Sequence, residues 1–147
     1  MTAFVSVKLL DSRARVPAYG SNHAAGADLY ALTDGPVTIA PGGTALIHTG
    51  IAVAVPQGYV GLVYARSGLA CKRGLAPANK VGVIDADYRG EVMIYLHNHG
   101  DEPQTVEDGE RVAQLVITPY LTAQFERADE LDGTERGSGG FGSTGTH

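Results

Sequence analysis

The sequence has no tryptophan, two methionines and a single cysteine among its 147 residues. Cys71 has no second cysteine to pair with, so an intrachain disulfide is excluded and nothing indicates an oxidising compartment. A nucleophilic cysteine would need a partnered base such as histidine, and none of the five histidines lies near Cys71 in the sequence. Cys71 is therefore predicted to be chemically passive.

Long apolar runs are also missing. The N-terminus shows no basic segment followed by an apolar run, and no stretch approaches the ~20 apolar residues that a membrane-spanning helix needs. From the sequence we therefore expect a soluble, cytoplasmic protein without a membrane partner.

Positive charge is scarce, because 11 lysines and arginines face 16 aspartates and glutamates, for a formal net charge of −5. Proteins that bind nucleic acid broadly carry a basic face, so we expect no nucleic-acid partner. Four basic residues nevertheless gather in the middle of the chain: Arg66, Lys72, Arg73 and Lys80. An anionic ligand would have to be held locally, in that region.

Glycine is abundant, with 20 residues, and it separates short segments in which apolar and polar residues alternate. Such segments are typical of half-buried strands. They cover residues 4–9, 36–40, 47–55, 59–64, 92–96, 104–107 and 111–117. Turn signals that recur roughly every eight to twelve residues indicate an all-β sandwich, barrel or jelly roll.

Arg66, Ser67 and Gly68 open the one helix that the sequence predicts. Ser67 is expected to cap this helix, which would run through Lys72 and stop at Gly74. Free N–H groups at the helix start, together with the Arg66 guanidinium, would suit an anion. A Ser-Gly cap after a surface arginine is also common without any ligand, so both interpretations stay open here.

The stretch from Gly82 to Gly90 has the most unusual chemistry of the chain. Val83 and Ile84 lead into an Asp-Ala-Asp turn, and the apolar alternation resumes at Val92, which predicts a hairpin. Two carboxylates, a phenol and a guanidinium share this turn. It is either the floor of an active site or a polar surface turn.

The C-terminal segment 136–145 is rich in glycine, which loses the most backbone entropy on ordering. It is therefore either a disordered tail or an arm that closes over a phosphate with its N–H groups, and the aromatic ring of Phe141 favours the arm. We divide the chain into a β domain, residues 1–132, and a flexible C-terminal arm, residues 133–147.

Two anion sites, one at Arg66 and one at Arg136, suggest a polyphosphate ligand. Hydrolysis of a phosphoanhydride needs a deprotonated water and a cation that neutralises developing charge. Asp85 is the preferred candidate for the base. Asp28 is a candidate for a water-mediated contact to a divalent cation that the phosphates would hold.

Five blocks of the sequence, in order, resemble the five motifs of the homotrimeric dUTP pyrophosphatases. The blocks are Ala25-Gly26-Ala27-Asp28-Leu29, Arg66-Ser67-Gly68-Leu69-Ala70, Gly82 to Gly90, Gly109 to Leu115, and Arg136 to Gly145. The resemblance implies a jelly-roll trimer with three active sites, each built from three chains. It also implies Mg²⁺-dependent hydrolysis of dUTP to dUMP and pyrophosphate, which limits uracil in DNA and supplies dUMP for thymidylate synthesis.

The same resemblance assigns roles to individual residues. Asp85 would orient the water that attacks the α-phosphorus, the Tyr88 ring would pack under the deoxyribose, and Asp28 would touch the magnesium shell through water. The backbone that would bind uracil, assisted by the Asn79 side chain, belongs to Gly82, Val83 and Ile84. The phosphate ligands would be Arg66, Ser67, Gly68 and Gln114. The lid over a neighbouring site would use Arg136, Phe141, Gly142, Ser143 and Thr144.

Two alternatives and one departure accompany this assignment. A dCTP deaminase resembles the family in fold, but it needs a glutamate at the position aligned with Tyr95. A non-enzymatic trimeric β module could dispense with Asp85 and Phe141, which this chain keeps. Ala65 stands where the family commonly has proline, which loosens the strand end without removing a phosphate ligand.

Overall fold

The computed structural model describes residues 2–140, which form eleven strands and one helix. The strands are β1 (Ser6–Leu9), β2 (Ala18–Tyr19), β3 (Ala27–Tyr30), β4 (Val37–Ile39), β5 (Thr44–Ala54), β6 (Tyr59–Tyr64), β7 (Leu75–Pro77), β8 (Gly82–Ile84), β9 (Glu91–Asn98), β10 (Gln104–Val106) and β11 (Arg111–Pro119). The helix α1 spans Ser67–Arg73. No helix within the described residues is long or apolar enough to cross a membrane.

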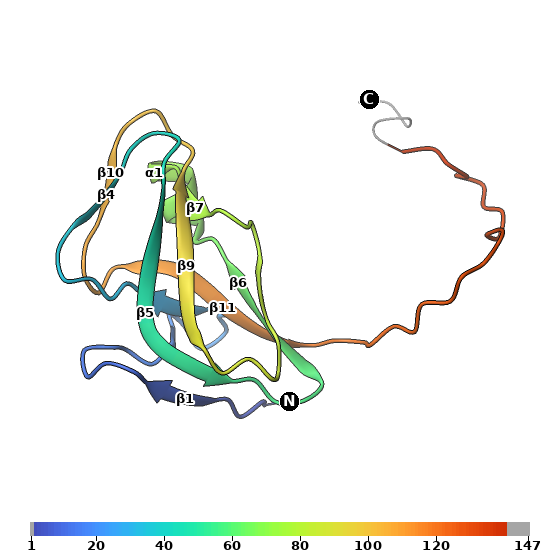
Figure 1. Ribbon diagram of the computed structural model, residues 1–147, viewed down its shortest axis with the longest axis horizontal. Helices are drawn as coiled ribbons and strands as arrows, with labels where there is room; N and C mark the ends of the chain where they lie inside the picture. The colour runs from blue at the N-terminus through green and yellow to red at the C-terminus, as the bar shows by residue number, and fades with distance from the viewer. Residues whose placement is uncertain (1, 141–147) are drawn as a thin grey trace.

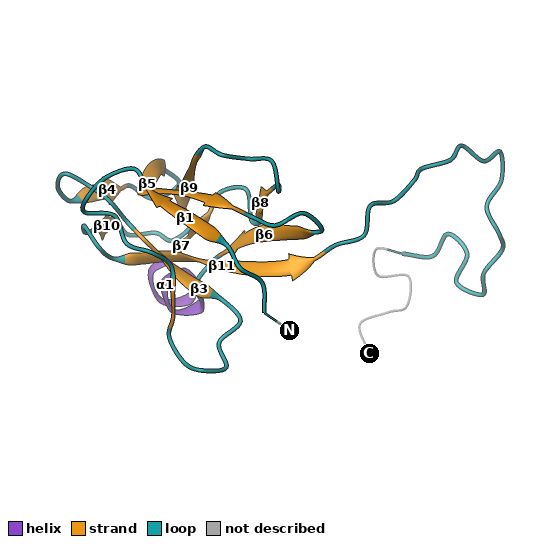
Figure 2. Ribbon diagram, turned by 90° about the horizontal axis from the view of Figure 1, so that it is seen from below, coloured by secondary structure: helices purple, strands orange, loops and turns teal. Residues whose placement is uncertain are grey.

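Two antiparallel sheets enclose the core (Figures 1 and 2). One has the order β1-β5-β9-β7, the other has the order β2-β3-β11-β6-β8, and β10 pairs with β4 in a separate ladder. Both sheets contribute to one hydrophobic cluster, which includes Ile47 and Leu96 from one sheet and Leu29 and Leu115 from the other. The predicted all-β fold with one short helix is confirmed.

The alternation in β5 shows why the sequence specifies this fold. All five residues expected on one face of the strand, Ile47, Thr49, Ile51, Val53 and Val55, are buried. Burying a branched apolar side chain stabilises the fold by about 1.5–3 kcal/mol. The burial of these residues therefore fixes which face of the strand packs against the core. The strands that the sequence did not indicate, β2, β3 and β7, have only two to four residues, too few for a period to show.

The helix begins one residue earlier than the sequence predicted. Arg66, with an extended backbone (φ −88°, ψ 128°), is the N-cap and makes no side-chain capping bond, whereas Ser67 is already helical. The prediction of Ser67 as the cap is therefore wrong, and its N–H is one of the free groups at the helix start. The predicted stop is confirmed, because Gly74 ends the helix in the left-handed region at φ 65°.

The stretch between β8 and β9 is not a hairpin turn, which corrects the sequence prediction. β8 pairs with β6 in one sheet, whereas β9 pairs with β5 and β7 in the other. Residues 85–90 therefore form a corner between the sheets. The alternation of apolar and polar residues predicts which residues are buried, and this prediction is right for β9. It does not predict which strand pairs with β8.

After β11 the chain leaves the body of the domain, as Figure 1 shows. Residues 120–138 are exposed and form neither strand nor helix. Leu121 and Phe125 are 96% and 94% exposed, so this segment contributes nothing to the core. The proposed division of the chain after residue 132 falls within it.

Candidate active site

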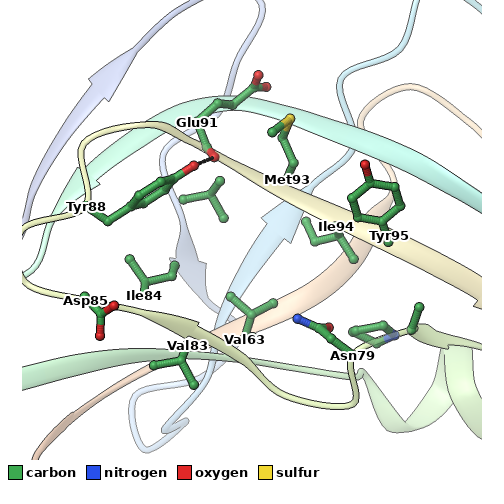
Figure 3. Close-up of a pocket in the computed structure, with 14 residues that line it drawn as sticks. Val63, Asn79, Val83, Ile84, Asp85, Tyr88, Glu91, Met93, Ile94 and Tyr95 are labelled. Atoms are coloured by element: carbon green, nitrogen blue, oxygen red, sulfur yellow. Dashed lines mark hydrogen bonds between the residues drawn. The ribbon is translucent and has the colours of Figure 1, made fainter.

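A cavity of about 560 Å³ opens at the corner between the two sheets. We call it the corner cavity. Six residues that the sequence singled out line it: Asn79, Gly82, Val83, Ile84, Asp85 and Tyr88. Figure 3 shows Met93 and Tyr95 of β9 across the cavity from β8 and Asn79. The comparison with the deaminase had pointed to the position of Tyr95, whereas the sequence gave no reason to expect Met93 in a site.

One wall of the corner cavity is an open sheet edge. β8 is the last strand of its sheet and pairs only with β6 among the described residues. The N–H and C=O groups on its outer edge therefore have no partner strand within residues 2–140. A planar ring that carries both donors and acceptors could pair with this edge as a strand would.

The Tyr88 ring is fixed against the corner by two local features. Its hydroxyl donates to the main-chain oxygen of Glu91 at 2.9 Å, drawn as the dashed line in Figure 3. A side chain at Gly90 would place a Cβ 2.5 Å from the Tyr88 hydroxyl oxygen, so glycine is needed for the ring to lie there. The exposed part of the ring forms a flat apolar surface in the cavity.

Asp85 follows β8 directly and is exposed. Its main-chain oxygen accepts from the Tyr88 N–H at 3.1 Å, which closes the turn. Its carboxylate has no hydrogen-bond or ion-pair partner among the described residues. Asp87, the other acid of this turn, does not line the corner cavity, although it lines a neighbouring surface hollow together with Asp85.

A second cavity, of about 310 Å³, lies where α1 begins, and we call it the arginine cradle. It is lined by Asp28, Arg66, Ser67, Gly68 and Gln114, all of which the sequence assigned to phosphate or magnesium. Asp28 is only 8% exposed and organises the cradle. Its two carboxylate oxygens accept from Arg66 Nε at 2.8 Å and from a second arginine, Arg111, at 3.2 Å.

Arg111 also lines the cradle, and reasoning from the sequence missed it. Its position in the fourth motif block was the available signal. Arg73, by contrast, does not line the cradle, because it pairs with Glu110 and donates to Gln104. The basic residues in the middle of the chain thus do not form a single cluster that could bind one anion.

Gln114 is held in the cradle by its neighbours. It lies beside Asp28 in the β3–β11 register, and its amide nitrogen donates to the Ala65 carbonyl at 2.8 Å. Its side chain covers Gly26 so closely that a Cβ at residue 26 would overlap the amide oxygen. Gly26 therefore sets where the Gln114 amide can stand.

Gly26→Ala is expected to displace the Gln114 amide and so to weaken substrate binding. The KM for an anionic substrate bound at the cradle should rise on the order of tenfold, the value of one lost hydrogen bond to a charged group, which steady-state kinetics would measure. Gly20→Ala is the matched control, since Gly20 lines the same cavity and a Cβ there would meet nothing within 4 Å. An equal change in both variants would contradict the role of Gly26.

The cradle can contact a divalent cation only indirectly. The described residues contain no cluster of three or more acidic, histidine or cysteine side chains that could hold a metal. Both oxygens of Asp28 are engaged with arginines, yet each keeps a lone pair that could accept from a metal-bound water. The donor set therefore fits Mg²⁺ whose inner ligands come from phosphate and water.

The two cavities share no lining residue. Arg136 lies on the exposed arm, where its Nε donates to the Gly139 carbonyl at 2.8 Å. Phe141, Gly142, Ser143 and Thr144 lie outside the described residues. Within one chain, the described residues do not bring the groups assigned to base, phosphate and lid into a single cavity.

An antiparallel β fold with an open sheet edge at one cavity, and two arginines around a buried carboxylate at another, suits a ligand that joins a planar ring to an anionic group, as a nucleotide does. The family model described as dUTPase matches residues 12–145. The chain is 54% identical to "Deoxyuridine 5'-triphosphate nucleotidohydrolase" of Syntrophotalea carbinolica, over 98% of this chain and 98% of that protein. The chain therefore belongs to the dUTPase family, and the expectation of an enzyme of this family is confirmed.

Solved structures agree with this assignment. A mutant dUTPase of Staphylococcus bacteriophage 80alpha with dUpNHpp matches with a TM-score of 0.88 and 32% identity, covering 98% of this chain and 99% of that chain. A mutant dUTPase from phage phi11 of S. aureus, whose structure reveals the coordination of a structural Mg(II) ion, matches with a TM-score of 0.77 and 29% identity, covering 86% and 97%. The jelly-roll-like fold expected from the sequence is confirmed.

Proposed function

We propose that this protein hydrolyses dUTP to dUMP and pyrophosphate. The observation that carries the proposal is the corner cavity, where an unpartnered carboxylate, a fixed aromatic ring and an open strand edge meet. The curated relative from Syntrophotalea carbinolica carries the corresponding name, deoxyuridine 5'-triphosphate nucleotidohydrolase.

Uracil would pair with the free edge of β8 through the main chain of Gly82, Val83 and Ile84, with the Asn79 amide assisting. Cytosine presents an amino group where uracil presents a carbonyl oxygen, so it would set donor against donor. The Tyr88 ring would lie under the deoxyribose. A ribose 2′-hydroxyl would then meet an apolar surface and lose its hydration without a partner.

The triphosphate would bind at the arginine cradle. Arg66 would donate to phosphate oxygens together with the free N–H groups of Ser67 and Gly68, and Gln114 would add an amide donor. Bound Mg²⁺ would neutralise charge on the phosphates, and Asp28 would touch its shell through water. Arg136 and the segment from Phe141 to Thr144 would close over the base and the γ-phosphate.

The reaction assigns one proton transfer to this chain. Asp85 would accept a proton from a water molecule while the water oxygen attacks the α-phosphorus. The bond between the α-phosphorus and the bridging oxygen to the β-phosphate breaks, and pyrophosphate leaves with that oxygen. The exposed, unpartnered carboxylate of Asp85 is available for this role.

The separation of the two cavities supports an assembly in which neighbouring chains complete each site. We propose a homotrimer in which the corner cavity of one chain faces the arginine cradle of a second, and the arm of a third supplies the lid. In the cytoplasm this activity would limit uracil incorporation into DNA and supply dUMP for thymidylate synthesis.

A substrate panel tests the proposal. The purified protein is mixed with Mg²⁺ and, separately, dUTP, dCTP, dTTP and UTP, and both pyrophosphate and ammonia are measured. We expect pyrophosphate from dUTP alone. Ammonia from dCTP would favour the deaminase, despite Tyr95 at the position of its glutamate. The absence of turnover with all four nucleotides would favour a non-enzymatic β module.

A further inference from the structure

Glu91 is a partly buried acid of the corner cavity that the proposed mechanism does not use. It is the first residue of β9, and its side chain is 21% exposed. Its carboxylate points away from the cavity (Figure 3) and is held by two donors on β5. Oε1 accepts from the Gly50 N–H at 2.8 Å, and Oε2 accepts from His48 Nδ1 at 3.0 Å.

These donors sit in an irregularity of β5. The register with β9 runs from His48 opposite Met93 to Ala52 opposite Glu91, so four steps on β5 face two on β9. Gly50 lies in this bulge at φ 68°, where a Cβ would stand 2.5 Å from Leu32 Cδ2. The bulge turns the Gly50 N–H toward the Glu91 carboxylate.

The ionised form of Glu91 is favoured in this place. Burial alone raises the pKa of Glu91, but the hydrogen bonds from His48 and Gly50 outweigh burial, and the pKa lies below its ordinary value. The carboxylate is therefore charged at neutral pH and holds both donors with charge-assisted bonds.

The main chain of Glu91 has a second partner on the cavity side. Its carbonyl oxygen accepts the Tyr88 hydroxyl at 2.9 Å, across only three residues. Glu91 thus joins the β5 bulge, through its side chain, to the Tyr88 ring, through its main chain. If the carboxylate is removed, the start of β9 can shift relative to β5, and the ring shifts with it.

We infer that Glu91 is a positioning residue that fixes where the Tyr88 ring lies in the corner cavity. The position of the ring in turn sets the discrimination between a deoxyribonucleotide and a ribonucleotide. The inference rests on the proposed function, because Tyr88 must face the sugar. It goes beyond that function in placing part of the sugar selectivity on β5, outside the cavity.

The test measures kcat/KM for dUTP and for UTP in variants of the full-length protein. Glu91→Ala should lower the ratio of the two values on the order of tenfold. Glu91→Gln should keep most of the ratio, because its amide oxygen can still accept from Gly50. His48→Ala removes one of the two donors to Glu91, and this donor is half exposed. This variant should lower the ratio by less than Glu91→Ala does, and it replaces Glu91→Ala as the test if that variant folds poorly. The double variant Tyr88→Phe, Glu91→Ala should lower the ratio by no more than the more damaging of the two single substitutions, because both act on the position of the same ring.

Thr44→Ala is the matched control. Thr44 Oγ1 contacts His97 Nδ1 at 3.0 Å across the same pair of strands, at the end far from Tyr88 in the register. Its ratio should stay at the wild-type value. The inference is overturned if Glu91→Ala keeps the wild-type ratio, or if both control and test lower it equally.

Failure of the proposed function gives a different result. The wild-type protein would then leave dUTP intact in the same assay. Calorimetric affinities for dUMP and UMP, compared between wild type and Glu91→Ala, still decide whether Glu91 positions the ring. An unchanged ratio of these two affinities would overturn the inference in that case also.

Discussion

Asp85→Asn is expected to abolish most turnover while leaving nucleotide binding nearly intact. Only the transition state needs a base, so the loss should appear in kcat, on the order of a thousandfold or more, rather than in affinity. Asparagine has nearly the shape of aspartate, and the carboxylate has no protein partner to lose among the described residues. Single-turnover kinetics, with calorimetry on a non-hydrolysable dUTP analogue, would measure the two effects separately.

Asp87→Asn provides the control for this substitution. Asp87 belongs to the same turn and carries the same charge, but it does not line the corner cavity. Its turnover should stay within a factor of about three of wild type. Equal losses in the two variants would mean that the charge of the turn, and not a base at Asp85, is what catalysis requires.

Truncation after Glu135 should reduce kcat by on the order of a hundredfold or more without lowering the melting temperature appreciably. The removed segment carries Arg136 and the proposed lid, so water exclusion and a phosphate contact are lost. Stability should be spared because residues 120–138 are exposed. Enzyme kinetics and thermal unfolding, measured on the same preparations, would check both parts.

Removal of His147 alone is the matching control, and it should leave activity unchanged. A truncated protein that unfolds at a much lower temperature would show that the segment supports the assembled fold. A truncated protein with full activity would contradict the proposal that this segment acts as a lid.

The fold could be predicted because burial leaves a periodic trace in the longer strands. Alternation identifies the inward residues of β9 correctly, and a glycine marks the end of α1. In β5 all the predicted inward residues are buried, but Gly50 and Ala52 between them are buried as well. The partner of β8 could not be predicted in this way. A hairpin and a corner between sheets have the same local sequence pattern, and long-range pairing with β6 decides between them.

The residues of the candidate site also fall into those that could be predicted from the sequence and those that could not. Residues grouped by motif lie together in the corner cavity and the arginine cradle. Arg111 was missed because its contact with Asp28 joins residues 83 positions apart. Glu91 was missed because its partners lie in a bulge, and bulges depend on the register between strands rather than on local sequence.

Complementation between inactive chains decides whether one active site takes its corner cavity and its arginine cradle from different chains. Chains with Asp85→Asn and chains with Arg66→Ala are unfolded, mixed in equal amounts and refolded together, and dUTP hydrolysis is measured. If a site takes its corner cavity and its arginine cradle from different chains, random assortment gives about a quarter of the sites both intact groups. The mixture should therefore regain up to about that share of wild-type activity. A mixture as inactive as its two parents would mean that the cavity and the cradle of one site come from the same chain.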